Sequence, residues 1–134
     1  IKCSLVGSEM CIRDSDTNSP MYDKKKSGDI KAGSGPALTF GPAVQNNLLD
    51  LLIKTADKKK IKYQLMAASR FTGTDTDAFA YSNEGVASAL ISLPLKYMHT
   101  TVETVHKDDV ESCINLIYES VLSIKKGQDF RYIK

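Results

Sequence analysis

The chain has 134 residues, 42% of them hydrophobic and 25% charged, and it carries a formal net charge of +2. Such a length allows a single domain with a modest core, and so small a charge argues against a nucleic-acid or membrane partner. No apolar stretch approaches the roughly 20 residues that a membrane span needs, and residues 1–6 are too short and polar for a secretory signal. We therefore expect a cytoplasmic protein.

The first part of the chain does not resemble a protein segment. Residues 5–14 resemble the in-frame translation of a transposase adapter used to prepare DNA sequencing libraries. We therefore expect residues 1–15 to be an artefact without ordered structure, and the natural sequence to begin near Asp16. A genuine polar N-terminal tail is the alternative. On the adapter interpretation, Cys113 is the only natural cysteine.

Helices and strands are predicted to alternate through the first half of the natural sequence. Residues 16–35 are polar and glycine-containing, which predicts a loop with one short strand around residues 29–31. Strands are predicted at 37–40 and 61–67. Between them, apolar residues at helical spacing predict a helix over residues 48–56, closed by a lysine triplet at its negative end.

The second half begins with a short helix at residues 78–81, which Asp75 or Thr76 could cap. The nearly continuous apolar run at 86–93 is typical of a strand buried on both faces, and Pro94 is expected to end it. An extended piece over 97–105 then leads into a final helix. That helix starts at Asp108 and Asp109, with an inward face of Val110, Cys113, Ile114, Ile117, Val121 and Ile124. The alternation favours an α/β layered sheet.

Two segments could carry chemistry. His99 follows the buried strand, where sites collect in open α/β sheets; its imidazole could bind a metal, act as a base or satisfy a structural hydrogen bond. Residues 72–77 place two carboxylates among hydroxyls, and could line a polar pocket, bind a cation or cap a helix. His106 is expected to face solvent. Cys113 is expected to be a small buried hydrophobe, because it lies on the apolar helix face.

Lysines cluster at residues 24–26 and at residues 58–60, and each triplet lies beside an aspartate. This pattern is typical of solvated loops or helix ends. A phosphate-binding patch is the alternative.

Four segments, in order, resemble the glutamyl-aminopeptidase and tetrahedral-aminopeptidase family of dinuclear metallopeptidases, some members of which carry an endoglucanase label. Residues 73–80 (GTDTDAFA) resemble its Gly-Thr-Asp-Ala motif, and residues 97–103 (YMHTTVE) its Tyr-(Ile/Met)-His-Ser-Pro-Val-Glu motif. Residues 84–95 resemble its glycine-valine and buried-strand segment, and residues 16–35 the stretch after an acidic ligand. The resemblance implies the C-terminal part of a zinc-peptidase-like α/β/α sandwich with a mixed sheet, over residues 16–134.

The resemblance also implies roles for particular residues. His99 would be a metal ligand, and Glu103 would support it from near the imidazole. Gly73, Thr74 and Asp75 would shape the substrate pocket. Asp16 would be the second aspartate of an Asp-x-Thr-x-x-Asp stretch and not a ligand itself. No catalytic base is implied within this chain, since the paired glutamates and the remaining ligands lie upstream in the family.

The activity implied is removal of N-terminal residues from peptides. Two divalent ions, zinc or cobalt, would activate a water for attack on the amide. The family also implies a homo-oligomer, often a dodecamer, in the parent enzyme. The 134 residues would then be inactive alone and bind metal weakly. Two other classes stay open: a non-catalytic binding module that uses its basic loops, and an endoglucanase-type glycan hydrolase, which would need two opposed carboxylates.

Overall fold

The computed structural model describes residues 8–17, 23–82 and 85–130. Four parts of the sequence-based interpretation therefore lie outside the described residues: residues 1–7, residues 18–22 of the polar segment 16–35, Glu84 of the glycine-valine segment and residues 131–134 of the C-terminal tail. The chain forms, in order, β1 (Ser8–Asp16), α1 (Lys24–Ser27), β2 (Ala37–Phe40), α2 (Asn46–Lys59), β3 (Gln64–Ala67), α3 (Asp75–Ala80), β4 (Ala87–Lys96), β5 (Thr104–Val105) and α4 (Lys107–Ser123).

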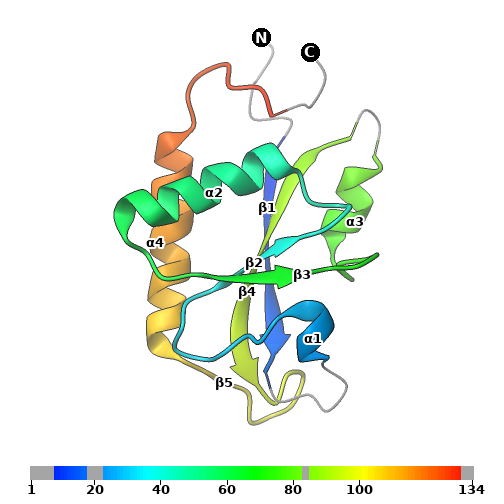
Figure 1. Cartoon of the computed structure of the whole chain (residues 1–134), viewed down its shortest axis with the longest axis vertical. Helices are drawn as coiled ribbons and strands as arrows, with labels where there is room; N and C mark the ends of the chain where they lie inside the picture. The colour runs from blue at the N-terminus through cyan, green and yellow to red at the C-terminus, as the bar shows by residue number, and fades with distance from the viewer. Residues whose placement is uncertain (1–7, 18–22, 83–84, 131–134) are drawn as a thin grey trace.

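The strands form one mixed sheet in the order β1-β4-β2-β3, with β5 also paired to β4 (Figure 1). β1 runs parallel to β4, whereas β2 and β5 run antiparallel to it. β2 and β3 are parallel to each other. The predicted α/β class with a mixed sheet is therefore confirmed.

β4 is the centre of the sheet and of the core. Residues 88–92 are buried without interruption, and α4 and α3 lie on opposite sides of the strand (Figure 1). Packing on both faces leaves no solvent-facing positions there, which is why the sequence lacks the polar alternation of a half-exposed strand. The prediction of a doubly buried strand is confirmed.

Pro94 does not end β4, as the sequence suggested. The strand continues to Lys96, and Pro94 is itself in register with Ser15 of β1. The carbonyl of Leu95 faces β1, where it accepts a hydrogen bond from the Thr17 N–H at 2.9 Å. The neighbouring Pro94 therefore faces the other side, where β2 reaches only as far as Ser92. A proline is tolerated there because no ladder partner requires its missing N–H.

Residues 8–15 are ordered as most of β1, whereas disorder was expected over residues 1–15. This strand follows β4 in parallel from Ser8 opposite Ala87 to Asp16 opposite Leu95. Strand pairing is a backbone interaction, so the open edge of a buried strand can order a neighbouring segment with little regard to its side chains. The adapter origin of these residues is a separate question and stays a prediction.

α2 begins and ends close to the predicted positions. Leu48, Leu49, Leu52 and Ala56 are buried on one face, and the helix ends at Lys60, which adopts the left-handed conformation with φ 57°. The expectation that the second lysine triplet marks a helix end is confirmed. By contrast, the first triplet lies in the short helix α1 and residues 29–31 form no strand.

The inward face of α4 differs from the predicted one. Cys113 and Leu116 are buried against the core, but Ile114 and Val121 are 60% and 48% exposed. A helix covers the sheet with a stripe about 100° wide, and the described neighbours of α4 fix that stripe at Asp109, Cys113, Leu116 and Ser120. Ile114 and Val121 lie outside it.

A buried carboxylate joins α4 to the loop before β2. Asp109 is fully buried and accepts hydrogen bonds from the backbone N–H groups of Gly33 and Gly35, both at 2.7 Å. Gly35 has φ +93°, and a Cβ there would lie 2.2 Å from the Lys62 carbonyl oxygen, so no other residue fits without backbone movement. The interaction spans 74 residues and holds the helix against the sheet.

Replacing Asp109 with alanine should lower the free energy of unfolding by about 3 kcal/mol, because the buried Gly35 N–H and the partly buried Gly33 N–H lose a charged acceptor. Urea titration followed by circular dichroism measures this. The neighbouring Asp108 is exposed, so Asp108→Asn is the matched control and should cost less than about 1 kcal/mol. Equal effects of the two substitutions would contradict the anchoring role of Asp109.

Candidate functional site

His99 lies in the turn between β4 and β5. Tyr97 and His99 both have positive φ angles, 59° and 63°, which are uncommon for residues other than glycine. The Thr100 hydroxyl donates a hydrogen bond to the Tyr97 carbonyl at 2.6 Å, and this bond stabilises the turn. β5 then pairs back onto the end of β4 through Val105 and Thr104. The pairing of β5 with β4 therefore closes the base of the turn, and the positive φ angle of His99 is a strained backbone conformation.

Glu103 holds the same turn through the backbone. Its carboxylate accepts a hydrogen bond from the His99 N–H, four residues earlier. The sequence interpretation placed Glu103 near the imidazole, whereas the contact in the structure is to the main chain. Any support of the ring by Glu103 is therefore indirect: it fixes the backbone from which the ring projects.

The His99 side chain is exposed, and its ring makes no hydrogen bond or ion pair with the described residues. It is thus available as a nitrogen ligand, and Asp16 ends the neighbouring parallel strand at the same edge of the sheet. Within the described residues, however, no group of three or more His, Cys, Asp or Glu side chains could hold a metal ion. A metal here would need ligands in addition to His99, because divalent sites of this kind take three or four.

The Gly73 loop is organised by the start of α3. Thr74 is the N-cap, and its hydroxyl accepts from the Thr76 N–H at 3.2 Å. Asp77 reaches back to accept from the N–H groups of Thr72 and Gly73, at 3.0 and 2.8 Å. Helix capping is thus the local role of this segment, with Thr74 as the cap in place of the expected Asp75 or Thr76.

The two carboxylates of this segment have different surroundings. Asp77 is partly desolvated, which alone would raise its pKa, but hydrogen bonds from Thr72, Gly73 and Thr74 outweigh this and lower the pKa. Asp75 is exposed and has no hydrogen-bond or ion-pair partner among the described residues. Of these two carboxylates, only that of Asp75 is free of hydrogen bonds and ion pairs with the described residues; its place in a substrate pocket stays a prediction.

The position of this loop relative to His99 follows from the sheet. α3 packs against β4 and β1, the two parallel strands whose carboxyl ends lead toward Asp16 and His99 (Figure 1). No hydrogen bond or ion pair among the described residues links Gly73, Thr74 or Asp75 to His99 directly. The Gly73 loop and the His99 turn are therefore both connected to the β1–β4 pair of strands, one through α3 and the other through the end of β4, but they do not bond to each other within the described residues.

The remaining candidates have structural roles. Cys113 is 3% exposed and burial raises the pKa of its thiol, so the prediction of a buried hydrophobe is confirmed. His106 is exposed, as expected, and is the N-cap of α4, where its Nδ1 accepts from the Asp108 N–H at 3.3 Å. In the described part of the chain, no helix combines the length and apolar character that crossing a bilayer requires.

Two solved peptidase structures share this arrangement of sheet and helices. An aminopeptidase from Desulfurococcus kamchatkensis superposes with a TM-score of 0.69 at 28% identity, over 84% of this chain and 32% of that one. The TET1 peptidase of Pyrococcus horikoshii, described as assembling into a tetrahedron or an octahedral shell, gives a TM-score of 0.67 at 28% identity, over 86% and 32% of the two chains. The fold is thus that of the α/β aminopeptidases.

Comparison of the sequence with known families agrees with the structural comparison. The profile of the M42 glutamyl aminopeptidase family matches residues 10–116, and this chain belongs to that family. A lysyl aminopeptidase from Pyrococcus furiosus is 36% identical over 98 residues, which cover 73% of this chain and 28% of the relative. The chain therefore spans less than a third of the length of this relative. The family resemblance in the sequence motifs is confirmed.

The lowered pKa of Asp77 predicts a pH-dependent contribution to stability. A carboxylate whose pKa is lower in the folded state than its unfolded value of about 3.9 stabilises the fold above that pH. The stabilisation is lost as the pH falls through the folded pKa. Asp77→Asn should therefore reduce the difference in unfolding free energy between pH 5 and pH 3, measured by urea titration. Asp75→Asn removes a neighbouring carboxylate that has no hydrogen bond with the described residues and is the control; a larger reduction in Asp75→Asn than in Asp77→Asn would refute the assignment.

Proposed function

We propose that this chain is the C-terminal part of the catalytic domain of a metal-dependent aminopeptidase, which removes N-terminal residues from peptides. The observation that carries the proposal is the exposed His99 ring, which has no hydrogen bond or ion pair with the described residues. It lies in a hydrogen-bonded turn beyond the central strand of a chain from the M42 family. Open α/β sheets bind ligands beyond the carboxyl ends of their strands.

In this proposal His99 is one metal ligand. Two divalent ions, zinc or cobalt, would supply an activated water and polarise the scissile carbonyl. The chain contributes one imidazole from a turn that Thr100 and Glu103 keep in place. The other ligands and the general base belong to the part of the catalytic domain that the chain does not span, consistent with its coverage of about a third of the related structures.

Gly73, Thr74 and Asp75 would shape the substrate pocket. Asp77 fixes the backbone before α3, so that Asp75 in the first turn projects a carboxylate into solvent. Such a carboxylate suits a cationic group on a peptide substrate, since opposite charges attract most strongly in a partly enclosed site. The free N-terminus of the peptide carries such a charge.

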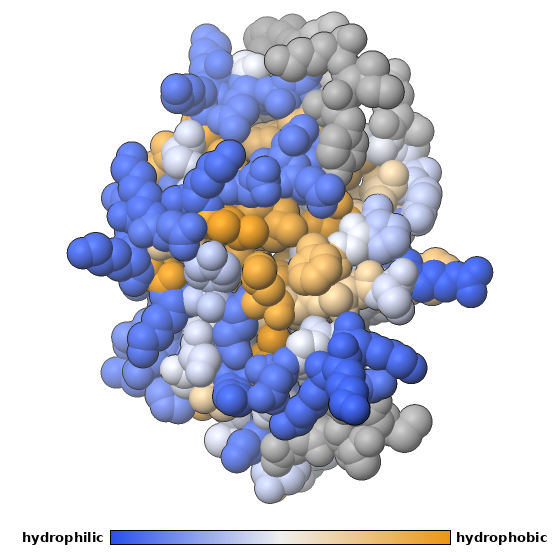
Figure 2. All heavy atoms as spheres, viewed as in Figure 1, coloured by the Kyte–Doolittle hydropathy of each residue, from blue (hydrophilic) through white to orange (hydrophobic). Residues whose placement is uncertain are grey.

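An uncovered apolar surface supports a longer parent protein. Figure 2 shows apolar side chains over β3 and the adjoining side of α2, surrounded by hydrophilic residues. Phe40 of β2 and Leu65 of β3 are 46% and 49% exposed. Contiguous exposed apolar area is typical of a surface that another segment covers. The upstream part of the catalytic domain is the proposed cover.

The assembly and location of the parent are also proposals. The P. horikoshii TET1 peptidase is described as forming tetrahedral or octahedral shells, which favours a homo-oligomer, as large as a dodecamer, for the parent of this chain. The composition favours the cytoplasm. We also propose that residues 1–15 derive from a sequencing adapter; the nucleotide sequence on the 5′ side of the Asp16 codon tests this.

The 134-residue chain should show no aminopeptidase activity and only weak zinc or cobalt binding, because one imidazole cannot complete a divalent site. A protein extended by the natural upstream sequence should hydrolyse aminoacyl-p-nitroanilides. In that protein His99→Ala should reduce kcat/KM by more than about 100-fold, beyond the usual loss for groups that merely support a ligand. His106→Ala is the control. An extended protein that is fully active with alanine at position 99 would exclude the ligand role.

Glu103→Gln in the extended protein should weaken metal affinity by about 10- to 100-fold while leaving the fold intact, because the turn that presents His99 loses its charged acceptor. Competition with a chelating dye measures the affinity, and circular dichroism checks the fold. Glu111→Gln removes an exposed carboxylate that pairs with Lys107 on α4 and serves as the control. Unchanged metal affinity in Glu103→Gln would show that the backbone contact does not matter for ligation.

An endoglucanase activity is the second candidate, because a structure described as a peptidase or endoglucanase superposes with a TM-score of 0.68 at 32% identity. Hydrolysis of a glycosidic bond needs a pair of carboxylates on either side of it. Asp77 is occupied with the backbone, which leaves Asp75 without a partner carboxylate on its loop. Parallel assays of the extended protein with carboxymethylcellulose and with aminoacyl substrates distinguish the two activities.

A further inference from the structure

A groove between α2 and α4 is lined by residues that the aminopeptidase proposal does not use. It has a volume of about 620 Å³, within the range of about 300–1,000 Å³ that is usual for ligand sites. Its α2 wall consists of Asn47, Leu51, Lys54, Thr55, Lys58 and Lys59. These positions share one face of the helix, since they recur at intervals of three and four residues. Leu122 and Ser123 of α4 line the other side of the groove.

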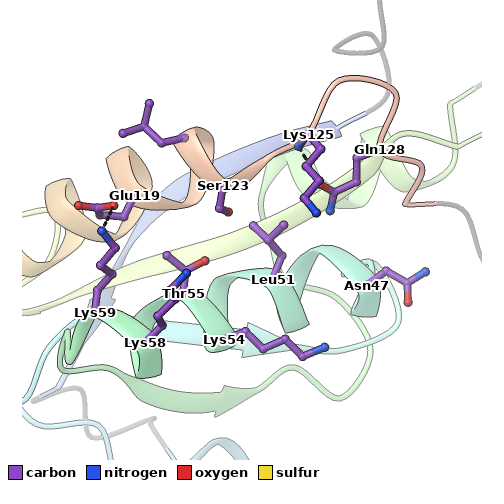
Figure 3. Close-up of a pocket in the computed structure, with 11 residues that line it drawn as sticks. Asn47, Leu51, Lys54, Thr55, Lys58, Lys59, Glu119, Ser123, Lys125 and Gln128 are labelled. Carbon is purple, nitrogen blue, oxygen red and sulfur yellow. Dashed lines mark hydrogen bonds and ion pairs between the residues drawn. The ribbon is translucent and has the colours of Figure 1, made fainter.

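A defined interaction lies at each end of the groove. At one end, the Lys59 ammonium and the Glu119 carboxylate form an ion pair at 2.8 Å, which crosses from α2 to α4 (Figure 3). At the other end, the Gln128 side chain accepts a hydrogen bond from the Lys125 N–H at 3.0 Å and shapes the turn after α4. Leu51 points from α2 toward α4 between these ends (Figure 3). The groove therefore has a defined interaction at each end and is open to solvent along its length.

The charge of the groove is positive and largely unbalanced. Four lysines line it against the single carboxylate of Glu119, which already pairs with Lys59. Lys54, Lys58 and Lys125 have no ion pair with the described residues. Like charges held around one groove repel each other, so an anionic occupant gains both the attraction and the relief of that repulsion.

We propose that this groove binds a short acidic peptide segment with an apolar side chain between its carboxylates. Lys54 and Lys58 on one wall and Lys125 on the other would pair with the carboxylates, and the apolar side chain would contact Leu51 and Leu122. The amide and hydroxyl groups of Asn47, Thr55, Ser123 and Gln128 can hydrogen-bond a peptide backbone. Inorganic phosphate would leave the leucines and most of the volume without contacts.

The groove is separate from the His99 turn. That turn leads through β5 into the N-terminus of α4, whereas the groove is formed by residues 119–123 near the other end of the helix. At 1.5 Å per residue, the two lie about 20 Å apart along the helix axis. The peptide site therefore does not rest on the aminopeptidase proposal, and either can fail without the other.

The test is titration of the 134-residue chain with the peptide Asp-Glu-Leu-Glu-Asp, acetylated and amidated at its ends. Acetylation removes the free amine that an aminopeptidase site would recognise. Calorimetry gives the affinity, and amide chemical shifts give the location, which should centre on Leu51 and Leu122. The combined change Lys54→Gln, Lys58→Gln and Lys125→Gln should weaken binding about tenfold or more, since three ion pairs are lost.

The charge-matched control is the combined change Lys25→Gln, Lys62→Gln and Lys96→Gln, at exposed lysines outside the groove. It should weaken binding less than threefold, which net charge alone accounts for. Equal weakening by both triple variants would overturn the groove assignment. Equal affinity for a peptide with glycine in place of leucine, or displacement of the peptide by an equal concentration of inorganic phosphate, would overturn the peptide chemistry.

Discussion

Strand β4 pairs with β1, β2 and β5, and its residues 88–92 are buried between α4 and α3. Because a doubly buried strand must satisfy its backbone groups within the sheet, the neighbouring strands are required for β4 to exist at all. The same strand sets the position of the candidate site. His99 follows its carboxyl end, and the α3 segment with Asp75 packs against its flank. Burial of one strand thus determines where the chemistry can occur.

Asp109, Asp77 and Glu103 each accept hydrogen bonds from backbone N–H groups in a loop. Asp109 fixes Gly33 and Gly35, Asp77 fixes Thr72 and Gly73, and Glu103 fixes His99. Hydrogen bonds to a charged acceptor are stronger than neutral ones, and each stabilises a loop with a positive backbone φ. The acidic residues near the candidate site are therefore largely structural. Asp75 differs from them, because its carboxylate accepts no hydrogen bond from the described residues.

The chain offers two surfaces with different chemistry at opposite ends of α4. One is the His99 turn, where the imidazole makes no hydrogen bond or ion pair with the described residues and is the proposed metal ligand. The other is the cationic groove near the C-terminal end of the helix, which has the Lys59–Glu119 ion pair at one end. The helix itself is held in place at its N-terminal end by Asp109, so the same anchor positions both surfaces relative to the sheet.

Local patterns in the sequence were sufficient to predict β2, α2, the burial of β4 on both faces and the burial of Cys113. Periodicity and side-chain size along a short segment indicate which face of a helix or strand is buried. The family motifs also lie within short segments, so the family could be recognised from the sequence. Tertiary structure alone decided that Pro94 stays within β4, that Leu116 and not Ile114 faces the core, and that residues 8–15 pair with β4. It also brought Asp109 to Gly33 across 76 residues and set the α2 lysines opposite Lys125. These depend on which distant segment lies beside each residue, and no pattern along the chain encodes that neighbour.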